Sequence, residues 1–202
     1  MTHRLVLASQ SPARLATLRS AGLDPEVVVS GVDESTVTTD DPTALALELA
    51  RLKARTVAAR ADDALVVGCD SVLAFGDAIL GKPADAEDAR QRWRRMRGRS
   101  GVLHTGHCVV DTGTGREVAR AAQTVVHFAA VTDDEIDAYV ATGEPLAVAG
   151  AFTIDGLGGA FVSSLEGDPH TVVGISLPLL RVMLAELDVS WTDLWKAGKP
   201  AH

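Results

Sequence analysis

Residues 65–70, Leu-Val-Val-Gly-Cys-Asp, form a continuous apolar run that ends in a carboxylate. A short run of this kind, bounded by polar residues, predicts a strand that is buried on both faces. Residues 71–80 follow as a predicted hairpin that turns at Gly76-Asp77. We therefore expect a central strand with Asp70 at its carboxyl end, where open α/β sheets bind their ligands.

Predicted strands and helices alternate on both sides of this run. Capping residues followed by proline mark helix starts at Ser11-Pro12 and Asp41-Pro42. We expect an α/β fold, a mixed twisted sheet with flanking helices, formed by one domain over residues 1–202. The expected strands are 5–8, 27–29, 65–70, 102–110 and 118–128, the expected helices are 12–22, 42–60, 86–96, 133–143 and 177–187, and the glycine-rich stretch 150–159 is expected between short strands.

The composition excludes several classes of function. A formal net charge of −8 argues against binding of a nucleic-acid polymer, because a basic face is needed to neutralise phosphates. A small anionic ligand remains compatible, since a few local cations can hold it. The sequence shows no signal peptide and no apolar run that could span a bilayer, so we expect a cytoplasmic protein with no membrane partner. Cys69 and Cys108 lie in apolar runs and are expected as buried thiols in a reducing compartment.

The segment from Ser9 to Arg14 predicts an anion site. A strand ends, a polar loop follows and a helix begins, so free backbone N–H groups and the helix dipole meet at the loop. Ser9 and Ser11 add hydroxyl groups, and Arg14 places a cation in a first turn where the dipole alone favours an anion. A bound phosphate would account for this arginine. An ordinary capped helix with a surface arginine accounts for it equally well.

Two further positions combine charge with unusual surroundings. Lys53 falls within the apolar arc of the predicted helix 42–60, so its ammonium either extends to solvent or meets an anion. Asp33 and Glu34 are adjacent carboxylates that follow the strand expected at 27–29. Such a pair can bind Mg²⁺ or form a solvated acidic turn.

Asp70, Lys82 and Asp155 complete the candidates. Asp70 could ligate a metal or accept a proton from water, although aspartate is also a common turn residue. Lys82, between a glycine and a proline, could reach a phosphate as a point charge. Asp155 lies among glycines, which allow close approach of the backbone to a ligand but also suit tight strand connections.

Other signals indicate structure rather than chemistry. The arginines of residues 90–97 lie opposite an apolar stripe and are expected to form a solvated face. His104 and His107 are three apart in a predicted strand, so they are expected to point to opposite faces, which disfavours a shared metal. The chain has no Walker A loop and no dinucleotide-binding fingerprint.

The order of these motifs along the chain is more specific than any single one. The segments LVLASQSPARLATLRSAGL, VDES, GCDS, LGKPADAEDA and GAFTIDGLGG, together with Lys53, resemble the Maf family of nucleotide pyrophosphatases. The resemblance covers nearly the whole chain, to about Leu187.

This resemblance implies a fold similar to that of the inosine triphosphate pyrophosphatases, with two lobes around a nucleotide cleft. It implies hydrolysis of nucleoside triphosphates between the α- and β-phosphates, with Mg²⁺ or Mn²⁺. It also implies a cytoplasmic, often dimeric protein with a house-cleaning role, in some members linked to arrest of cell division.

The resemblance also assigns roles by motif position. Asp70 corresponds to the proton acceptor, and Lys53 and Lys82 correspond to the lysines that contact phosphate. The implied substrate-binding residues are Ser9, Ser11, Arg14, Ser71 and Asp155, and the implied metal ligands are Glu34, Asp33 and Asp70.

Three positions depart from the members that prefer thymidine and uridine triphosphates. Those members carry arginine, threonine and glutamine where this chain has Ala13, Ser71 and Asp155. Glutamine both donates and accepts hydrogen bonds, whereas an ionised aspartate only accepts. Our hypothesis is that Asp155, if it faces the base, favours bases that offer donors, such as guanine or cytosine.

Two other functions stay open. One is a nucleotide-binding regulator of cell division without turnover, which the joint presence of Asp70, Lys53 and Lys82 disfavours. The other is a phosphatase with an aspartyl nucleophile, which usually has a second aspartate two residues later, where this chain has Val72.

Overall fold

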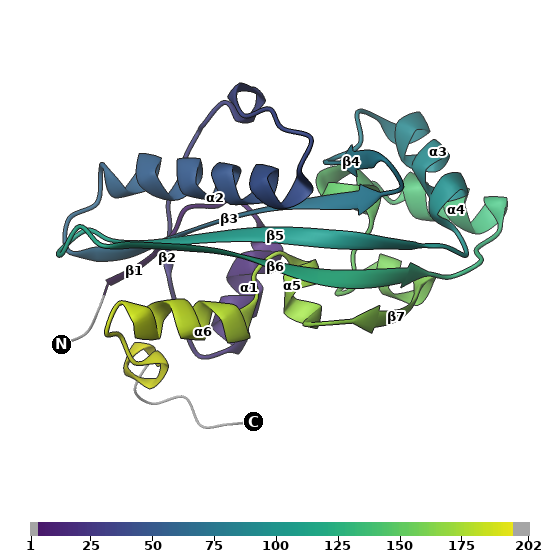
Figure 1. Ribbon diagram of the computed structural model, residues 1–202. Coiled ribbons are helices and arrows are strands. Elements are labelled where there is room, and N and C mark those ends of the chain that lie inside the picture. The colour runs from purple at the N-terminus through teal and green to yellow at the C-terminus, as the bar shows by residue number, and fades with distance from the viewer. Residues whose placement is uncertain (1–3, 196–202) are drawn as a thin grey trace.

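The computed structural model describes residues 4–195 and consists of one mixed sheet with helices on both faces (Figure 1). The sheet has the strand order β2-β1-β3-β5-β6-β7, and β4 pairs with β3. The strands are β1 (Arg4–Leu7), β2 (Glu26–Val27), β3 (Ala64–Phe75), β4 (Ala78–Leu80), β5 (Ser100–Asp111), β6 (Glu117–Phe128) and β7 (Val162–Glu166). The helices are α1 (Pro12–Ser20), α2 (Pro42–Ala58), α3 (Ala86–Met96), α4 (Asp133–Ala141), α5 (Pro169–Val173) and α6 (Leu177–Glu186).

The α/β class and most predicted elements are confirmed. Ser11, Asp41, Asp85 and Ser176 each cap a helix through their side chains, and Thr132 forms the expected capping box with Glu135. These caps satisfy backbone N–H groups that have no partner within the first turn of a helix. Local chemistry therefore fixed where these helices begin.

The prediction that Asp70 ends a strand is wrong. β3 continues to Phe75 before it turns into β4, so Asp70 lies in the middle of a strand of 12 residues. The reason is its neighbour β5, which pairs with β3 from Leu65 to Ala74 and keeps the chain extended past the carboxylate. Local polarity favoured a turn at Asp70, but the ladder to β5 outweighs it.

What ends near Asp70 is a neighbouring strand. β1 runs parallel to β3 only as far as Val67, and β4 pairs with β3 only from Leu73 onward. Between these two pairings, residues 68–72 form a free edge of β3 among the described residues. Asp70 and Ser71 lie on this free edge, and their side chains point to opposite faces because successive residues of a strand alternate.

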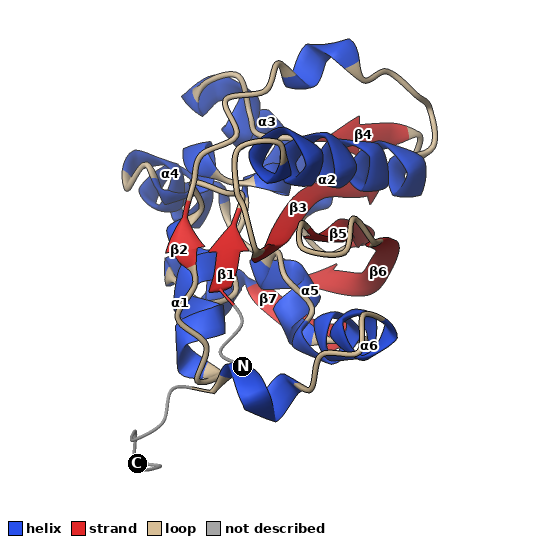
Figure 2. Cartoon of the chain, turned by 90° about the vertical axis from the view of Figure 1, so that its left-hand side faces the viewer, coloured by secondary structure: helices blue, strands red, loops and turns tan. Residues whose placement is uncertain are grey.

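α2 lies on one face of the sheet, and α1 and α6 lie on the other (Figure 2). Two glycines allow α2 to come very close. A Cβ at Gly68 would lie 2.5 Å from the Ala50 carbonyl oxygen, and a Cβ at Gly106 would lie 2.2 Å from the Ala46 carbonyl oxygen. No other residue fits at such distances, so these two glycines set the separation between α2 and the sheet.

The two largest of the four buried apolar clusters in residues 4–195 lie in different halves of the structure, which correspond to the expected two lobes. The first joins β1, the first half of β3, α1 and α6, with Leu7, Leu18 and Met183 at its centre. The second joins the far half of β3 to α3 and α4, around the buried ring of Trp93. The two smaller clusters lie under α2. β3, β5 and β6 run through both lobes (Figure 1).

Three local predictions differ from the structure. β2 has only two residues, because only Glu26 and Val27 pair with β1. The glycine-rich stretch contains 3₁₀ turns at Ala149–Ala151 and Leu157–Phe161, and only the strand after it, β7, is present. The short helix α5 was missed, since a proline-led turn of five residues has no apolar periodicity.

We expect Gly106→Ala to lower the free energy of unfolding by about 3 kcal/mol or more, because the added methyl group meets the backbone of α2. Chemical denaturation would measure the change. Gly113→Ala is the matched control. Its nearest neighbours are carboxylate oxygens at 3.4 Å, so the change should stay within about 0.5 kcal/mol. Equal losses for both variants would contradict the role of close packing.

Candidate active site

A cleft of about 1070 Å³ opens beside the free edge of β3, between the two lobes. The predicted anion segment from Ser9 to Arg14 lines it together with Lys53, Lys82 and residues of the glycine-rich stretch. Of the predicted site residues, only Asp33 does not line the cleft. The others are Ser9, Ser11, Arg14, Glu34, Lys53, Asp70, Ser71, Lys82 and Asp155.

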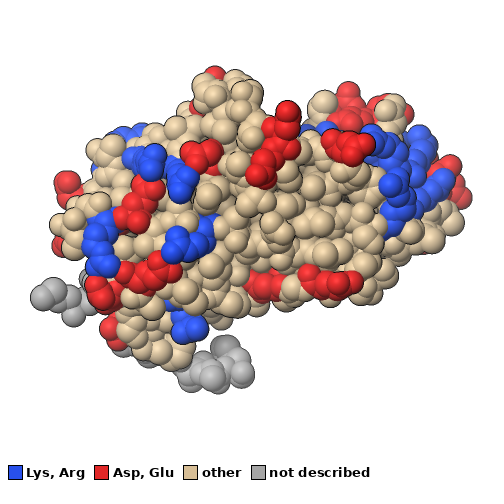
Figure 3. Space-filling model, viewed as in Figure 1, with Lys and Arg blue, Asp and Glu red and all other residues tan. Residues whose placement is uncertain are grey.

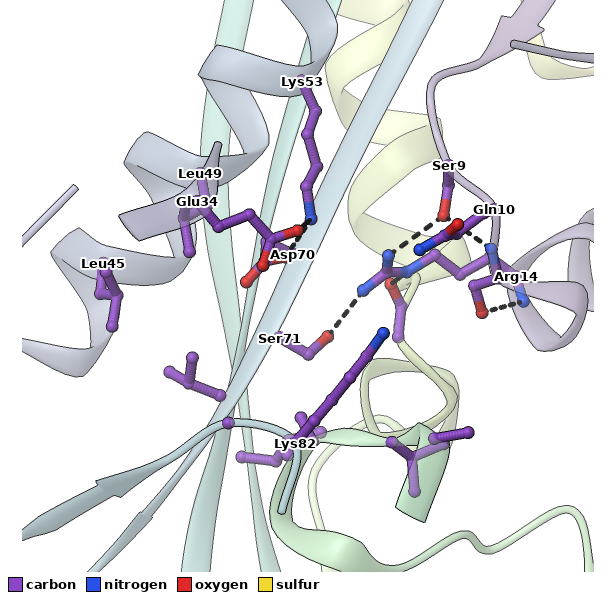
Figure 4. Close-up of a pocket in the computed structure, with 18 of the residues that line it drawn as sticks. Ser9, Gln10, Arg14, Glu34, Leu45, Leu49, Lys53, Asp70, Ser71 and Lys82 are labelled. Carbon is purple, nitrogen blue, oxygen red and sulfur yellow. Dashed lines mark hydrogen bonds and ion pairs between the residues drawn. The ribbon is translucent and has the colours of Figure 1, made fainter. Parts of the chain in front are cut away.

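Lys53 binds two carboxylates on the α2 side of the cleft (Figure 4). Its Nζ lies 2.5 Å from Asp70 Oδ1 and 2.7 Å from Glu34 Oε1. The Lys53 and Asp70 side chains are each 11% exposed, whereas that of Glu34 is 55% exposed. Of the two outcomes open for a lysine in an apolar arc, meeting an anion is the one observed.

The spacing of α2 explains why this ion pair forms. Asp70 pairs directly with Gly106, so its side chain shares a face with the glycine against which α2 rests. The helix is therefore close enough for Lys53 to reach the sheet carboxylate. Glu34 arrives from a separate 3₁₀ turn, Glu34–Thr36, in the loop before α2.

Arg14 holds the opposite side of the cleft together (Figure 4). Its Nε donates to the Gly174 carbonyl at 2.8 Å, and its terminal nitrogens donate to Ser9 Oγ and Ser71 Oγ, each at 3.2 Å. One guanidinium thus joins the opening loop, β3 and the end of α5. A planar fork of N–H donors suits this joining role and leaves further N–H groups for an anion.

The hydroxyl groups of Ser9 and Ser71 differ in what they can still donate. Thr105 Oγ1 donates to the Thr171 carbonyl at 2.8 Å, so in its 2.9 Å contact with Ser71 Oγ it must accept. The Ser71 proton is therefore directed inward. Ser9 Oγ accepts from the Ser11 N–H and from Arg14, which leaves its own proton free to donate into the cleft.

Lys82 is the second lysine of the cleft, and it extends into the space between the two sides (Figure 4). Its backbone is fixed by Arg92, which donates to the Gly81 carbonyl at 2.7 Å, and by the buried ring of Pro83. Within residues 4–195 the Lys82 ammonium forms no ion pair, in contrast to that of Lys53. Like the unused N–H groups of Arg14, this ammonium is free to meet an anionic ligand.

The remaining two candidates occupy different positions. Asp33 is exposed and accepts hydrogen bonds from the N–H and hydroxyl groups of Ser35, which lower the pKa of its carboxyl. It caps the turn that presents Glu34 to Lys53. Asp155 is exposed at the rim of the cleft, in the loop between the two 3₁₀ turns of the glycine-rich stretch.

Glu34 and Asp70 could together bind a divalent metal whose remaining ligands come from the substrate and water. Both carboxylates face the same ammonium, so their oxygens point to a common place. In the part of the chain that the structure describes, no cluster of three or more His, Cys, Asp or Glu side chains could hold an ion alone. Mg²⁺ often binds one or two carboxylates and completes its shell with substrate phosphates and water, which matches this donor set.

Sequence patterns gave no signal for the contacts of the buried histidines behind the site. His107 Nε2 accepts a hydrogen bond from the Ser176 N–H at 2.8 Å, and burial with the nearby charge of Arg14 lowers the pKa of His107 to about 4. His104 instead contacts Thr43 Oγ1 at the start of α2. The expected opposite orientation of these two histidines is confirmed, but their partners lie too far along the chain to be read from local patterns.

The basic run of residues 90–97 is solvated in part: Arg94 and Arg95 are exposed as predicted, whereas the Arg92 side chain is only 13% exposed. Arg90, Arg92 and Arg97 pair with Asp137, Asp88 and Asp133. Figure 3 shows basic side chains gathered over α3 and α4 with acidic side chains beside them. In residues 4–195, none of the helices combines the length and apolar character that crossing a membrane requires.

Comparison with known proteins gives one family. The sequence model of the family described as Maf-like protein matches residues 4–187. The chain is 64% identical to a nucleoside triphosphate pyrophosphatase of Salinispora tropica, over 98% of this chain and 90% of the relative. It is 61% identical to a protein of the same name from Streptomyces coelicolor, over 96% and 95% of the two chains. It is 57% identical to one from Cutibacterium acnes, over 100% and 99%.

We expect acid to weaken the fold through His107. The unfolded histidine takes up a proton near its ordinary pKa of 6.5, whereas the folded one does so only near 4. The unfolded state therefore binds more protons between these values, and stability is lost as the pH falls through this window. From pH 7 to pH 5 this histidine alone should cost about 2 kcal/mol.

Chemical denaturation at both pH values would measure this loss. His107→Gln keeps an acceptor for the Ser176 N–H and should reduce the fall in unfolding free energy between pH 7 and pH 5. Gln91→Ala on the exposed face of α3 provides the control, because neither side chain titrates and the fall should stay unchanged. An unchanged fall in His107→Gln would refute this assignment.

Proposed function

The chain belongs to the Maf-like protein family, and from this premise we propose that it hydrolyses nucleoside triphosphates to a nucleoside monophosphate and pyrophosphate. Beyond the family, the geometry of the site supports this proposal. Two carboxylates held at one lysine face a free lysine and an arginine across the same cleft. A cleft with separate acidic and basic walls suits a reaction that activates water beside a polyphosphate.

The acidic wall is proposed to prepare the nucleophile. Water must attack the α-phosphorus while pyrophosphate leaves, and Asp70, which lines the cleft, is proposed to orient this water and accept its proton. The ammonium of Lys53 holds Asp70 in one orientation at 2.5 Å and limits the repulsion between Asp70 and Glu34. Lys53 would move from carboxylate toward phosphate as charge develops on the substrate.

The basic wall is proposed to bind the phosphates. Lys82 has no competing carboxylate among the described residues and supplies a point charge to the leaving pyrophosphate. Ser9 donates its free hydroxyl proton. The start of α1 adds the Ala13 N–H, since the Ser11 and Arg14 N–H groups already donate to serine hydroxyls. Arg14 contributes its unused N–H groups while its other N–H groups keep the wall assembled.

A divalent cation, Mg²⁺ or Mn²⁺, is proposed as the cofactor, with Glu34 and Asp70 as its protein ligands. When bound, such an ion lowers the pKa of its water and offsets charge on phosphate oxygens. Aspartate is a weak base near neutral pH, which supports a cation beside it. Asp33 is proposed to act on this site through the turn that presents Glu34.

We also propose a location in the cytoplasm, a house-cleaning role and a homodimer. The free thiols of Cys69 and Cys108 fit a reducing cytoplasm. A house-cleaning role, a homodimer and the absence of nucleic-acid partners follow from the family resemblance and from the net charge of −8.

We expect Asp70→Asn to lower kcat by about 10²- to 10⁴-fold, because the amide cannot accept a proton from water. Purified protein would be incubated with a panel of standard and modified nucleoside triphosphates and with Mg²⁺ or Mn²⁺, and the products identified. Monophosphate and pyrophosphate support the proposal. Release of orthophosphate would indicate a phosphatase, and nucleotide binding without turnover would indicate a regulator.

The same panel tests Asp155. If its carboxylate accepts from the base, guanosine or cytidine triphosphate should have the higher kcat/KM, and Asp155→Gln should shift the preference toward uridine or thymidine triphosphate by about tenfold. A strong and selective preference of the unmodified protein for thymidine triphosphate would contradict the hypothesis. Asp77→Asn, at the β3–β4 turn on the same cleft, is the matched control.

A further inference from the structure

Glu144 lies behind the glycine-rich loop, away from the phosphate-binding walls, and its carboxylate accepts four hydrogen bonds. Oε1 accepts from the Tyr139 hydroxyl at 2.9 Å, the Thr153 hydroxyl at 2.6 Å and the Gly158 N–H at 2.9 Å. Oε2 accepts from the Leu157 N–H at 3.0 Å. Three of these donors belong to residues 153–158, so a single side chain closes this loop.

Two glycines of the loop let its backbone come close to Glu144 and Tyr139. A Cβ at Gly156 would lie 2.5 Å from Glu144 Oε2, so the loop backbone comes closer to the carboxylate than any side chain would allow. The neighbouring Gly158 is equally restricted, with a would-be Cβ only 2.3 Å from the Tyr139 hydroxyl. Glycines that looked like a ligand-binding signal in the sequence thus make room for Glu144 and Tyr139.

Tyr139, one of the donors to Glu144, is itself held rigidly by aromatic packing. Tyr139 is buried in α4 and packs edge-on against Trp93 and Phe161, with ring centroids 5.6 Å and 5.3 Å apart. Burial raises the pKa of Tyr139, so its hydroxyl keeps its proton to donate. The loop is therefore tied through one carboxylate to the core of the second lobe.

The electrostatics favour an ionised carboxylate at this point. Burial by itself would raise the pKa of Glu144, but the hydrogen bonds from Thr153, Leu157, Gly158 and Tyr139 outweigh it and lower the pKa. Only an ionised carboxylate offers acceptors at both oxygens to donors that surround it.

Two residues of the loop 153–158 line the cleft, where a nucleotide base would bind. Thr153 and Asp155 both line the cleft, and Thr153 is also a direct partner of Glu144. Asp155 stands between the contacts at Thr153 and at Leu157, so its position depends on both.

We propose that Glu144 is a positioning residue for base recognition: its carboxylate holds residues 153–158 in the shape that presents Asp155 to the nucleotide base. This rests on the proposed function in one respect, that a nucleotide occupies the cleft. Glu144 itself touches no substrate. Its removal should loosen base recognition and leave the chemistry at Asp70 and Lys53 nearly intact.

Glu144→Gln tests the structural half without any substrate. A glutamine keeps the size of the side chain, but its amide nitrogen must face the Leu157 N–H or the three donors at Oε1. Amide hydrogen exchange of residues 153–158, measured by mass spectrometry, should quicken by about tenfold or more, while exchange in α2 and β3 stays unchanged. Unchanged exchange in the loop would overturn the proposal.

Kinetics on the nucleotide panel test the functional half. For Glu144→Gln we expect KM to rise about tenfold and kcat to stay within about twofold, because base contacts bind the ground and transition states alike. The ratio of kcat/KM between preferred and non-preferred bases should fall toward one. A loss of kcat with the base preference retained would overturn the proposal.

Two further variants keep the test decisive. Tyr139→Phe preserves the buried ring and removes one donor, so it should give smaller changes in the same direction. Glu87→Gln is the control, since the ion pairs of this exposed carboxylate lie within α3. If the unmodified protein turns over no nucleotide, the proposed function fails. The exchange result still decides whether Glu144 holds the loop.

Discussion

The close contact between α2 and the sheet is the constraint on which the site depends. Gly68 and Gly106 have no side chains, and so the helix backbone rests directly on β3 and β5. Asp70 lies opposite Gly106 on the same face, which brings it within reach of Lys53. A larger residue at either glycine would lift the helix and separate the ammonium from the carboxylate.

The free edge of β3 turns this contact into a cleft with two walls. Asp70 and Ser71 are neighbours in sequence, yet they face opposite sides of the sheet. The first joins Lys53 on the α2 side and the second joins Arg14 on the α1 side. Because β1 ends before this point and β4 begins after it, both walls open onto one space. A ligand along this edge meets carboxylates and cations from different layers of the fold.

The glycine-rich loop of the second lobe lines the cleft beside these two walls, and it is held in place differently. This loop has little regular structure of its own, and it is held by buried polar contacts instead. Glu144 collects four donors around one carboxylate, and Trp93 donates to the Ala151 carbonyl at 2.7 Å. Such networks specify one conformation only when every member is satisfied, which is the case for the Glu144 carboxylate.

The α/β class and most helix starts could be predicted from the sequence, because caps and apolar periodicity are local. The order of the motifs indicated the residues of the cleft through the family resemblance, and of these residues only Asp33 does not line it. The sequence could not place Asp70 within β3, since the pairing with β5 that extends the strand comes from residues far along the chain. Nor could it show that Lys53 meets two carboxylates or that Glu144 closes the loop. Those contacts join separate elements, so only tertiary packing decides them.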